Sequence, residues 1–349
     1  MHAVTISRSA LMATCLATVS AFLAPAAYAD VDVGAGHEGA DTKQQGSLDG
    51  HSLASRITFS GGTKGGGGRS TGGLTPVGNW TPPACWYEPY SVDEFAKNTE
   101  EGYSLVADDP RQPSYAKSSV AQFRSYYKDG EYKDYNKDKA DEGNWWVATR
   151  DRERWLTPEA QQCDKQPFWV DNGDTPPVEN AVTPEILAQL AYNRVSVPDT
   201  HVTMAPEGPT KVNLPTWAWL DRATFKNVSV TASLNVNGLN IQATTTAKPV
   251  SLKLEPGTSD AETYPAGGEC RINDDGSIGE AFARGDAGRE PSCGINYLRS
   301  SGDGAYKLRA TITWQIDWTG SGGAGGDLPD GTFGTTQDVT VQEIQSVNR

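Results

Sequence analysis

Residues 306–318 read YKLRATITWQIDW, and this stretch decides the fold. Apolar side chains occupy every second position from Tyr306 to Trp318, and polar side chains occupy the positions between them. A period of two is typical of a β-strand that buries one face. At about 3.3 Å per residue the run would extend roughly 40 Å, which is longer than most strands, so we also expect a bulge or bend partway along it. Trp314, Ile316 and Trp318 are predicted to lie in the core of one sheet.

Further strand patterns surround this stretch. Apolar and polar residues alternate in three segments, 228–236, 239–243 and 250–254. Residues 212–220 are predicted to form a further strand, and Pro215 suits an edge or an entry strand, because proline cannot donate to a ladder. Asn237-Gly238 is the pair that a type I′ hairpin turn prefers. Roughly six to eight strands in about 150 residues are typical of an all-β sandwich of immunoglobulin type, which we predict for residues 199–349.

Residues 84–198 have a different composition, rich in Trp, Tyr and charge. Four helix starts are indicated: Ser91 with Glu94, Ser118 or Ser119, Thr157-Pro158, and Thr183-Pro184. The helix after Thr183 is the clearest, because Ile186, Leu187 and Leu190 fall on one face. The fold class predicted is therefore α+β in two parts. A small, mainly helical aromatic domain tied by a disulfide precedes the β-sandwich.

The first residues have the pattern of a signal peptide. Arg8 is followed by an apolar run over 10–23 and by Ala27-Tyr28-Ala29, whose small residues suit cleavage after Ala29. The alternative is a short membrane anchor, but the run is short for a span and lacks a basic flank on its far side. We expect residues 1–29 to be removed, no membrane span to remain, and the protein to be secreted, either extracellular or associated with the cell surface.

Residues 30–83 are rich in Gly, Ser and Thr. So little apolar surface does not offset the entropy of ordering the chain, so we predict a disordered arm, with a strand indicated only at 57–59. Gly34-Ala35-Gly36-His37-Glu38-Gly39 matches GxGxxG, and a reductase that used this turn would bind a nicotinamide cofactor. Such a turn needs a buried strand before it and a helix after it, and the sequence indicates neither. We expect no cofactor.

Charge and cysteine content limit the partners and the compartment. Removing residues 1–29 takes away one of 30 basic residues and none of 44 acidic residues, which leaves 29 against 44 and a net charge of −15. An acidic exported chain is poorly suited to bind nucleic acid. Four cysteines remain, Cys85, Cys163, Cys270 and Cys293, and an even number indicates two disulfides. Three pairings are open, and locality favours Cys85 with Cys163 and Cys270 with Cys293. A four-thiolate zinc site would need close CxxC pairs.

No catalytic motif stands out. His201 is the only histidine in a region expected to be ordered, no nucleophile elbow such as GxSxG accompanies it in such a region, and HExxH does not occur. Asp134, Asn136 and Asp138 resemble the start of a calcium loop, but Lys139 occupies the position that requires glycine. Paired carboxylates for glycoside cleavage are compatible with so many acidic residues. The candidate ligand-contact residues are aromatic, and they serve either a sugar-binding groove or a core: Trp86, Trp145, Trp146 and Trp169.

Five short segments resemble an uncharacterised family of secreted actinobacterial proteins. They are CWYEP at 85–89, WW at 145–146, LAQLA at 187–191, NLPTW at 213–217 and WQIDW at 314–318. The resemblance covers most of the chain from Cys85 onward and implies no established activity and no functional residues. Residues 199–349 are also similar to PKD-like sandwiches of exported proteins. Their hallmark WxFGDG-like turn is replaced here by LKLEPG at 252–257.

These observations lead to two functional hypotheses. The first is a secreted, non-enzymatic interaction or cell-envelope-associated protein, whose partner is an extracellular protein or an envelope glycan. The alternative is a secreted, polysaccharide-acting hydrolase that uses paired carboxylates within 85–168. The sequence indicates neither a metal site nor an oligomeric state.

Overall fold

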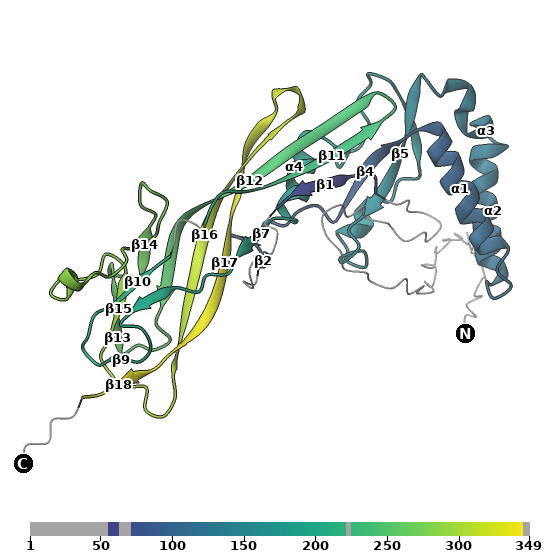
Figure 1. The fold of residues 1–349 in the computed structure, drawn as a ribbon. Coiled ribbons are helices and arrows are strands. Elements are labelled where there is room, and N and C mark those ends of the chain that lie inside the picture. The colour runs from purple at the N-terminus through teal and green to yellow at the C-terminus, as the bar shows by residue number, and fades with distance from the viewer. Residues whose placement is uncertain (1–54, 63–70, 221–224, 345–349) are drawn as a thin grey trace, which may run out of the picture. The chain divides into compact units, whose positions relative to one another are not determined.

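The computed structural model describes residues 55–62, 71–220 and 225–344 (Figure 1). The predicted signal peptide and the Gly34–Gly39 turn lie outside these residues. Within the described ranges, no helix is both long and apolar enough to cross a membrane. The protein is mostly β, and its strands form several antiparallel sheets and one short parallel pair.

The main sheet is built around the strand that the alternating pattern predicts. This strand, β16 (Tyr306–Gly320), buries Trp314, Ile316 and Trp318 on one face, so that prediction is confirmed. Its pairing with β17 shifts register between Trp314 and Ile316, which is the expected irregularity. The sheet has seven strands in the order β1-β11-β12-β16-β17-β3, and β14 also pairs with β12. Their bounds are β1 Thr58–Gly61, β3 Thr75–Pro76, β11 Val228–Val236, β12 Leu239–Glu255, β14 Glu269–Arg271 and β17 Gly325–Val339.

The hairpin between β11 and β12 confirms the predicted turn. Asn237 and Gly238 both have positive φ, 43° and 82°, as a type I′ turn requires. The two strand segments predicted after this turn are one continuous strand, β12. Their apolar positions switch from odd to even numbers, and the register shift between Pro249 and Ser251 absorbs the extra residue.

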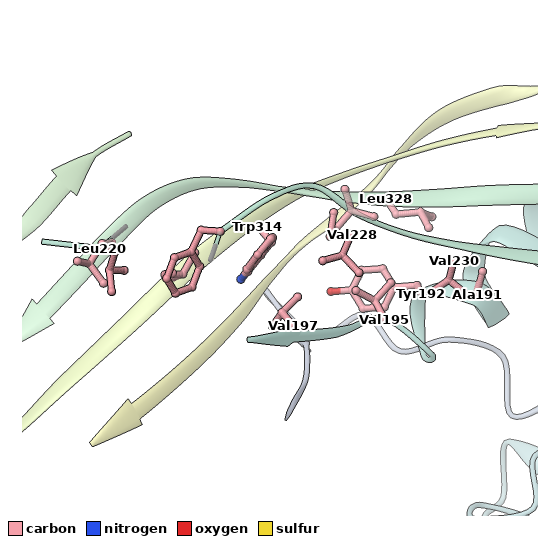
Figure 2. Close-up of a cluster of buried hydrophobic side chains, with 14 of the residues drawn as sticks. Ala191, Tyr192, Val195, Val197, Leu220, Val228, Val230, Trp314 and Leu328 are labelled. Carbon is pink, nitrogen blue, oxygen red and sulfur yellow. The ribbon is translucent and has the colours of Figure 1, made fainter. Parts of the chain in front are cut away.

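A second, four-stranded sheet shares its core with the main sheet. Its order is β13 (Ala261–Tyr264), β15 (Gly294–Tyr297), β10 (Thr216–Trp219) and β8 (Thr203–Ala205). Ile295 and Ala218 of this sheet belong to the same hydrophobic cluster as Ile312 and Trp314, which we name the large core. Figure 2 shows part of this core, including Trp314, Val228 and Tyr192. Several antiparallel sheets around one core agree with the predicted all-β character. The immunoglobulin-like sandwich is not confirmed by this arrangement.

Short elements complete the β structure. The strands β18 (Val341–Gln342) and β9 (Thr210–Lys211) pair in parallel, and β2 (Thr71–Gly73) pairs with β7 (Ser196–Pro198). The described residues also form the 3₁₀ helices η1 Lys137–Lys139, η2 Ala160–Gln162, η3 Arg284–Asp286 and η4 Ser321–Gly323.

The aromatic domain contains a sheet that the sequence did not indicate. We name as the aromatic module the antiparallel strands β4 (Cys85–Tyr90), β5 (Gly143–Arg150) and β6 (Phe168–Asp171) with helices α1 (Val92–Ala107), α2 (Ser114–Lys128) and α3 (Lys133–Asn136). Ser91 caps α1 as predicted, because its side chain accepts a hydrogen bond from the Glu94 amide. The second helix starts at Ser114, earlier than predicted, since extended Pro113 precedes it without a side-chain cap. The domain predicted to be mainly helical thus combines a three-stranded sheet with a small helical part.

Two segments are more closely associated with the sheets than we predicted. One is helix α4 (Pro184–Tyr192), and the other is the described part of the expected disordered arm. Helix α4 has the predicted Thr183 cap, yet Leu187 and Ala188 lie in the large core beneath β11 and β12, so the domain boundary expected near residue 198 does not separate α4 from the sheet. The described residues of the expected disordered arm, 55–62 and 71–83, contribute β1, β2 and β3 to sheets. Backbone pairing orders this segment, although few of its side chains are apolar.

The turn at α3 has an uncommon backbone. Lys133, Asp134, Tyr135 and Asn136 have φ values of 39°, 44°, 64° and 63°, and none of them is glycine. A left-handed conformation costs an ordinary residue roughly 1–2 kcal/mol. Tyr135 is buried, and its carbonyl accepts a hydrogen bond from Trp145 Nε1 at 2.9 Å, so packing holds the turn in this conformation.

Glycine at an exposed position of this turn is expected to stabilise the protein. Lys133→Gly should raise the free energy of unfolding by about 0.5–1 kcal/mol, because glycine adopts positive φ without steric cost. Lys137 is the matched control, since its φ is −58° and its ψ is −30°. Lys137→Gly should lower stability by about 1 kcal/mol, as in an ordinary helical turn. Urea denaturation of both variants measures this, and equal destabilisation by both would contradict the strain argument.

Candidate functional site

The strand β4 carries a charged residue on an otherwise apolar face. Trp86, Glu88 and Tyr90 alternate along β4 and therefore point to the same side of the three-stranded sheet. The Glu88 side chain is completely buried, with a relative exposure of 0%. Burying a carboxylate is costly unless hydrogen bonds replace its hydration. This residue is therefore the first candidate for a functional group.

Five donors surround the Glu88 carboxylate. Three are hydroxyl groups and two are N–H groups: Ser55 Oγ at 3.2 Å, Tyr90 Oη at 3.1 Å, Thr149 Oγ1 at 2.9 Å, the Arg56 amide at 3.2 Å and Trp86 Nε1 at 3.4 Å. They come from β4, from β5 and from the segment that leads into β1. The hydrogen bonds that the structure shows at Glu88 include no charged donor, so the carboxylate has no direct salt bridge.

Burial dominates the titration of this cluster. Loss of hydration raises the pKa of Glu88 above its ordinary value, although the hydrogen bonds from Thr149, Tyr90, Arg56 and Trp86 act in the opposite direction. The pKa of Tyr90 is raised well above its ordinary value, first by burial and then by the neighbouring Glu88 charge. A carboxyl group with a raised pKa is a common feature of functional sites, although structural networks also produce it.

Glu88 lies between two hydrophobic clusters. Trp86 belongs to the large core, whereas Tyr90 packs with Phe95 and Trp145 in the helical core of the aromatic module. Arg56 adds an ionic contact at the edge of this junction, because its guanidinium pairs with Glu94 of α1. The same guanidinium lies over the Tyr90 ring at 5.9 Å. The cluster is a polar junction between two apolar regions.

The geometry limits what Glu88 can do chemically. A side chain with no exposed surface does not meet a substrate in this conformation, and none of its hydrogen-bond partners is a second carboxyl group. Glycoside cleavage needs two carboxyl groups across an open cleft. In the part of the chain that the structure describes, no group of three or more His, Cys, Asp or Glu residues could hold a metal ion. Glu88 therefore connects β4, β5 and the segment before β1 through buried hydrogen bonds.

The four candidate tryptophans do not form one groove. Trp86, Trp145 and Trp146 are buried, and only Trp169 is partly exposed. Neighbouring strand residues point to opposite faces, so Trp145 lies in the helical core while Trp146 packs with the Cys85–Cys163 disulfide. The structure brings Trp145 and Trp169 together, with ring centroids 5.6 Å apart in an edge-to-face arrangement. Of the four rings, a ligand could stack only on Trp169.

Trp169 lies at the rim of the aromatic module. A Cβ atom at Gly143 would come within 2.7 Å of the Trp169 ring, so the glycine allows the indole to pack against the backbone. The indole N–H donates to Asp171 Oδ1 at 2.6 Å. Tyr126 is an exposed tyrosine whose ring packs against Tyr127 and Tyr132, and it donates to Glu131 Oε2 at 2.9 Å. A helix was predicted in this region from Ser118 or Ser119, but no sequence pattern singled out Tyr126.

A charged cluster links the three helices of the module. Glu100 of α1 accepts hydrogen bonds from Arg124 and Lys128 of α2 and from Tyr135 of α3. Burial alone would raise the pKa of Glu100, but these donors outweigh it and lower the pKa to about 2. The carboxylate is therefore charged over nearly the whole pH range, which suits a structural ion pair rather than an acid catalyst.

The remaining sequence candidates have simple positions. Both disulfides join the cysteines that locality favoured, Cys85 to Cys163 and Cys270 to Cys293. His201 is exposed on the segment between β7 and β8. Asp134 pairs with Lys137 across the left-handed turn. Comparison of the chain with protein-family models, with curated proteins and with solved structures gives no match in any of the three.

Proposed function

We propose that this chain is a secreted, non-enzymatic interaction or cell-envelope-associated protein that contacts an extracellular protein or an envelope glycan through the rim of the aromatic module. The observation that carries the proposal is the position of Trp169, half-buried over Gly143 and beside the Asp171 carboxylate. Tryptophan with one polar edge and a partly open ring is typical of contact surfaces. The two disulfides and the absence of a membrane-spanning helix from the described residues are consistent with an exported protein.

A binding screen tests this proposal. The mature chain is screened against envelope glycans and culture-supernatant proteins, and we expect a partner with a Kd tighter than about 1 mM. Trp169→Ala should then weaken binding at least about tenfold, equivalent to about 1.4 kcal/mol. Tyr115 is the matched control, because it is an aromatic residue of α2 with 58% relative exposure away from this rim. Equal effects of the two variants, or no partner at all, would count against the proposal.

A secreted polysaccharide hydrolase is the second candidate. The observation that favours it is the raised pKa of the Glu88 carboxyl group, which a general acid requires. Access to Glu88 would require the segment that carries Ser55 and Arg56 to move away. The wild-type protein and Glu88→Gln are tested for turnover of a panel of polysaccharides. Activity of the wild type that is lost in Glu88→Gln would establish this function, and an inactive wild type would exclude it.

A further inference from the structure

One segment of the chain connects the aromatic module to the edge of the main sheet. Ser55 and Arg56 bind Glu88, Ile57 is 1% exposed in the large core, and β1 then pairs with β11 from Thr58 to Gly61. The Glu88 carboxyl group is thus the hydrogen-bonding partner that β4 offers to the start of this segment. If the contact opened, the Arg56 amide and the Ser55 hydroxyl would be released together.

The cluster can accommodate both protonation states of Glu88, but unequally. The hydroxyl groups of Ser55, Tyr90 and Thr149 can rotate so that their oxygens accept a hydrogen bond, whereas the Arg56 amide and the Trp86 indole can only donate. A protonated carboxyl can therefore donate from Oε2 to Ser55 and still accept three hydrogen bonds at Oε1. The ionised form keeps all its donors but leaves a buried charge without a direct counterion.

Few charged or titratable groups face this carboxyl. Tyr90 contributes a phenol from β4, and Thr149 contributes an uncharged hydroxyl from β5. Arg56 lies in the segment that precedes β1. Its guanidinium pairs with Glu94 of α1 and also donates to the Asn235 carbonyl of β11 at 3.4 Å. The guanidinium therefore pairs with acceptors other than Glu88.

We propose that Glu88 is a pH-dependent latch, whose neutral form holds the Ser55–Gly61 segment against β4 and whose ionisation loosens that segment together with the edge strand β1. The proposal is independent of what the rim of the aromatic module binds. It gives the buried carboxyl group a conformational role.

The direction of the effect follows from proton linkage. With the segment docked, burial holds the pKa of Glu88 above its ordinary value of 4.5, and a released, hydrated carboxyl returns to that value. The docked state therefore binds the proton more tightly than the released state. Docking is strongest below the released pKa of 4.5 and weakens as the pH rises through the docked pKa. Each unit between the two pKa values changes the docking constant about tenfold.

Hydrogen exchange of the full chain measures the docking directly. Amide protection over residues 55–61, corrected for the intrinsic exchange rate, is followed from about pH 4 to about pH 8. Wild-type protection should fall as the pH rises over this range, because the docked state binds the Glu88 proton more tightly. Glu88→Gln should stay protected with little pH dependence, since the amide oxygen accepts three hydrogen bonds and the amide nitrogen can donate to Ser55. Wild-type protection that does not fall with pH would overturn the proposal, as would a pH dependence that persists in Glu88→Gln.

Two further variants keep the test decisive. Glu94→Gln removes the other carboxylate near this segment, and it should retain the wild-type pH profile; loss of the profile in this variant would assign the effect to the Arg56–Glu94 pair instead. Ser55→Ala removes the hydroxyl that accepts a hydrogen bond from the protonated Glu88 carboxyl, and Ser55 itself lies outside the sheets. It should lower protection most at low pH and so flatten the profile. An unchanged profile in Ser55→Ala would also contradict the latch, even if Glu88→Gln did not fold.

Discussion

Replacement of Trp314 by alanine is expected to lower the free energy of unfolding by about 3–5 kcal/mol. The Trp314 side chain is 0% exposed at the middle of β16, and α4 and both large sheets contribute side chains to the core around it (Figure 2). The indole is too large for its surroundings to fill the space that truncation leaves, so a cavity adds to the lost burial of apolar surface. Urea denaturation, followed by circular dichroism, gives the free energy of unfolding.

A milder substitution at the same position separates shape from hydrogen bonding. Trp314 Nε1 is buried and has no hydrogen-bond partner within the described residues. Trp314→Phe removes this unpaired donor and keeps most of the ring, so we expect a loss of less than about 1.5 kcal/mol. Gln315→Ala on the exposed side of the same strand should change stability by less than about 0.5 kcal/mol. A Trp314→Ala protein as stable as Gln315→Ala would refute the assignment of the core.

Removal of the two disulfides is expected to cost different amounts of stability. The Cys85–Cys163 disulfide spans 78 residues, and the Cys270–Cys293 disulfide spans 23. The chain-entropy relation gives losses of about 4.5 and about 3.4 kcal/mol, because the longer loop restricts the unfolded chain more. Each pair is replaced by alanine, and unfolding is measured for the two variants and the oxidised wild type.

The order of the two losses is the decisive result. All four disulfide-bonded cysteines are at most 2% exposed, so their replacement by alanine removes a similar buried volume at each site. A larger loss at Cys270–Cys293 than at Cys85–Cys163 would mean that local packing, rather than loop length, sets the contribution of these cross-links.

Local patterns predicted the elements whose geometry depends on nearby residues. The alternation through Trp314, the pair Asn237-Gly238 and the Thr183 cap each act within a few residues, and the structure confirms all three. The strand β3 was missed for the opposite reason, and of β1 only the part within 57–59 was indicated. Thr58 pairs with Ser233 and Thr75 with Thr332, so the partners that order these segments are far away in the chain. Composition alone favoured disorder there.

The candidate site shows a second limit of sequence patterns. Trp145 and Trp146 were grouped because they are adjacent, yet adjacency in a strand sends side chains to opposite faces. The alternation of side chains along a strand would also have identified Glu88 as a candidate. If 85–90 is read as a strand, Trp86, Glu88 and Tyr90 share one face, and a carboxyl group between two large aromatic residues is a buried charge that needs partners. Its partners Ser55 and Thr149 could not be inferred, since nothing local connects them to β4.

The pairing of β3 with β17 has a consequence for the order of assembly. Thr75 and Thr332 meet across 257 residues, and Thr58 and Ser233 meet across 175. Contacts between residues so distant in the chain form slowly, because the loop between them must close before the contact repays its entropy. The main sheet therefore takes its two outer strands, β1 and β3, from the earliest described residues, whereas its inner strands follow much later in the chain. The strand β1 must remain unpaired until β11 is available, and β3 must remain unpaired until β17 is available.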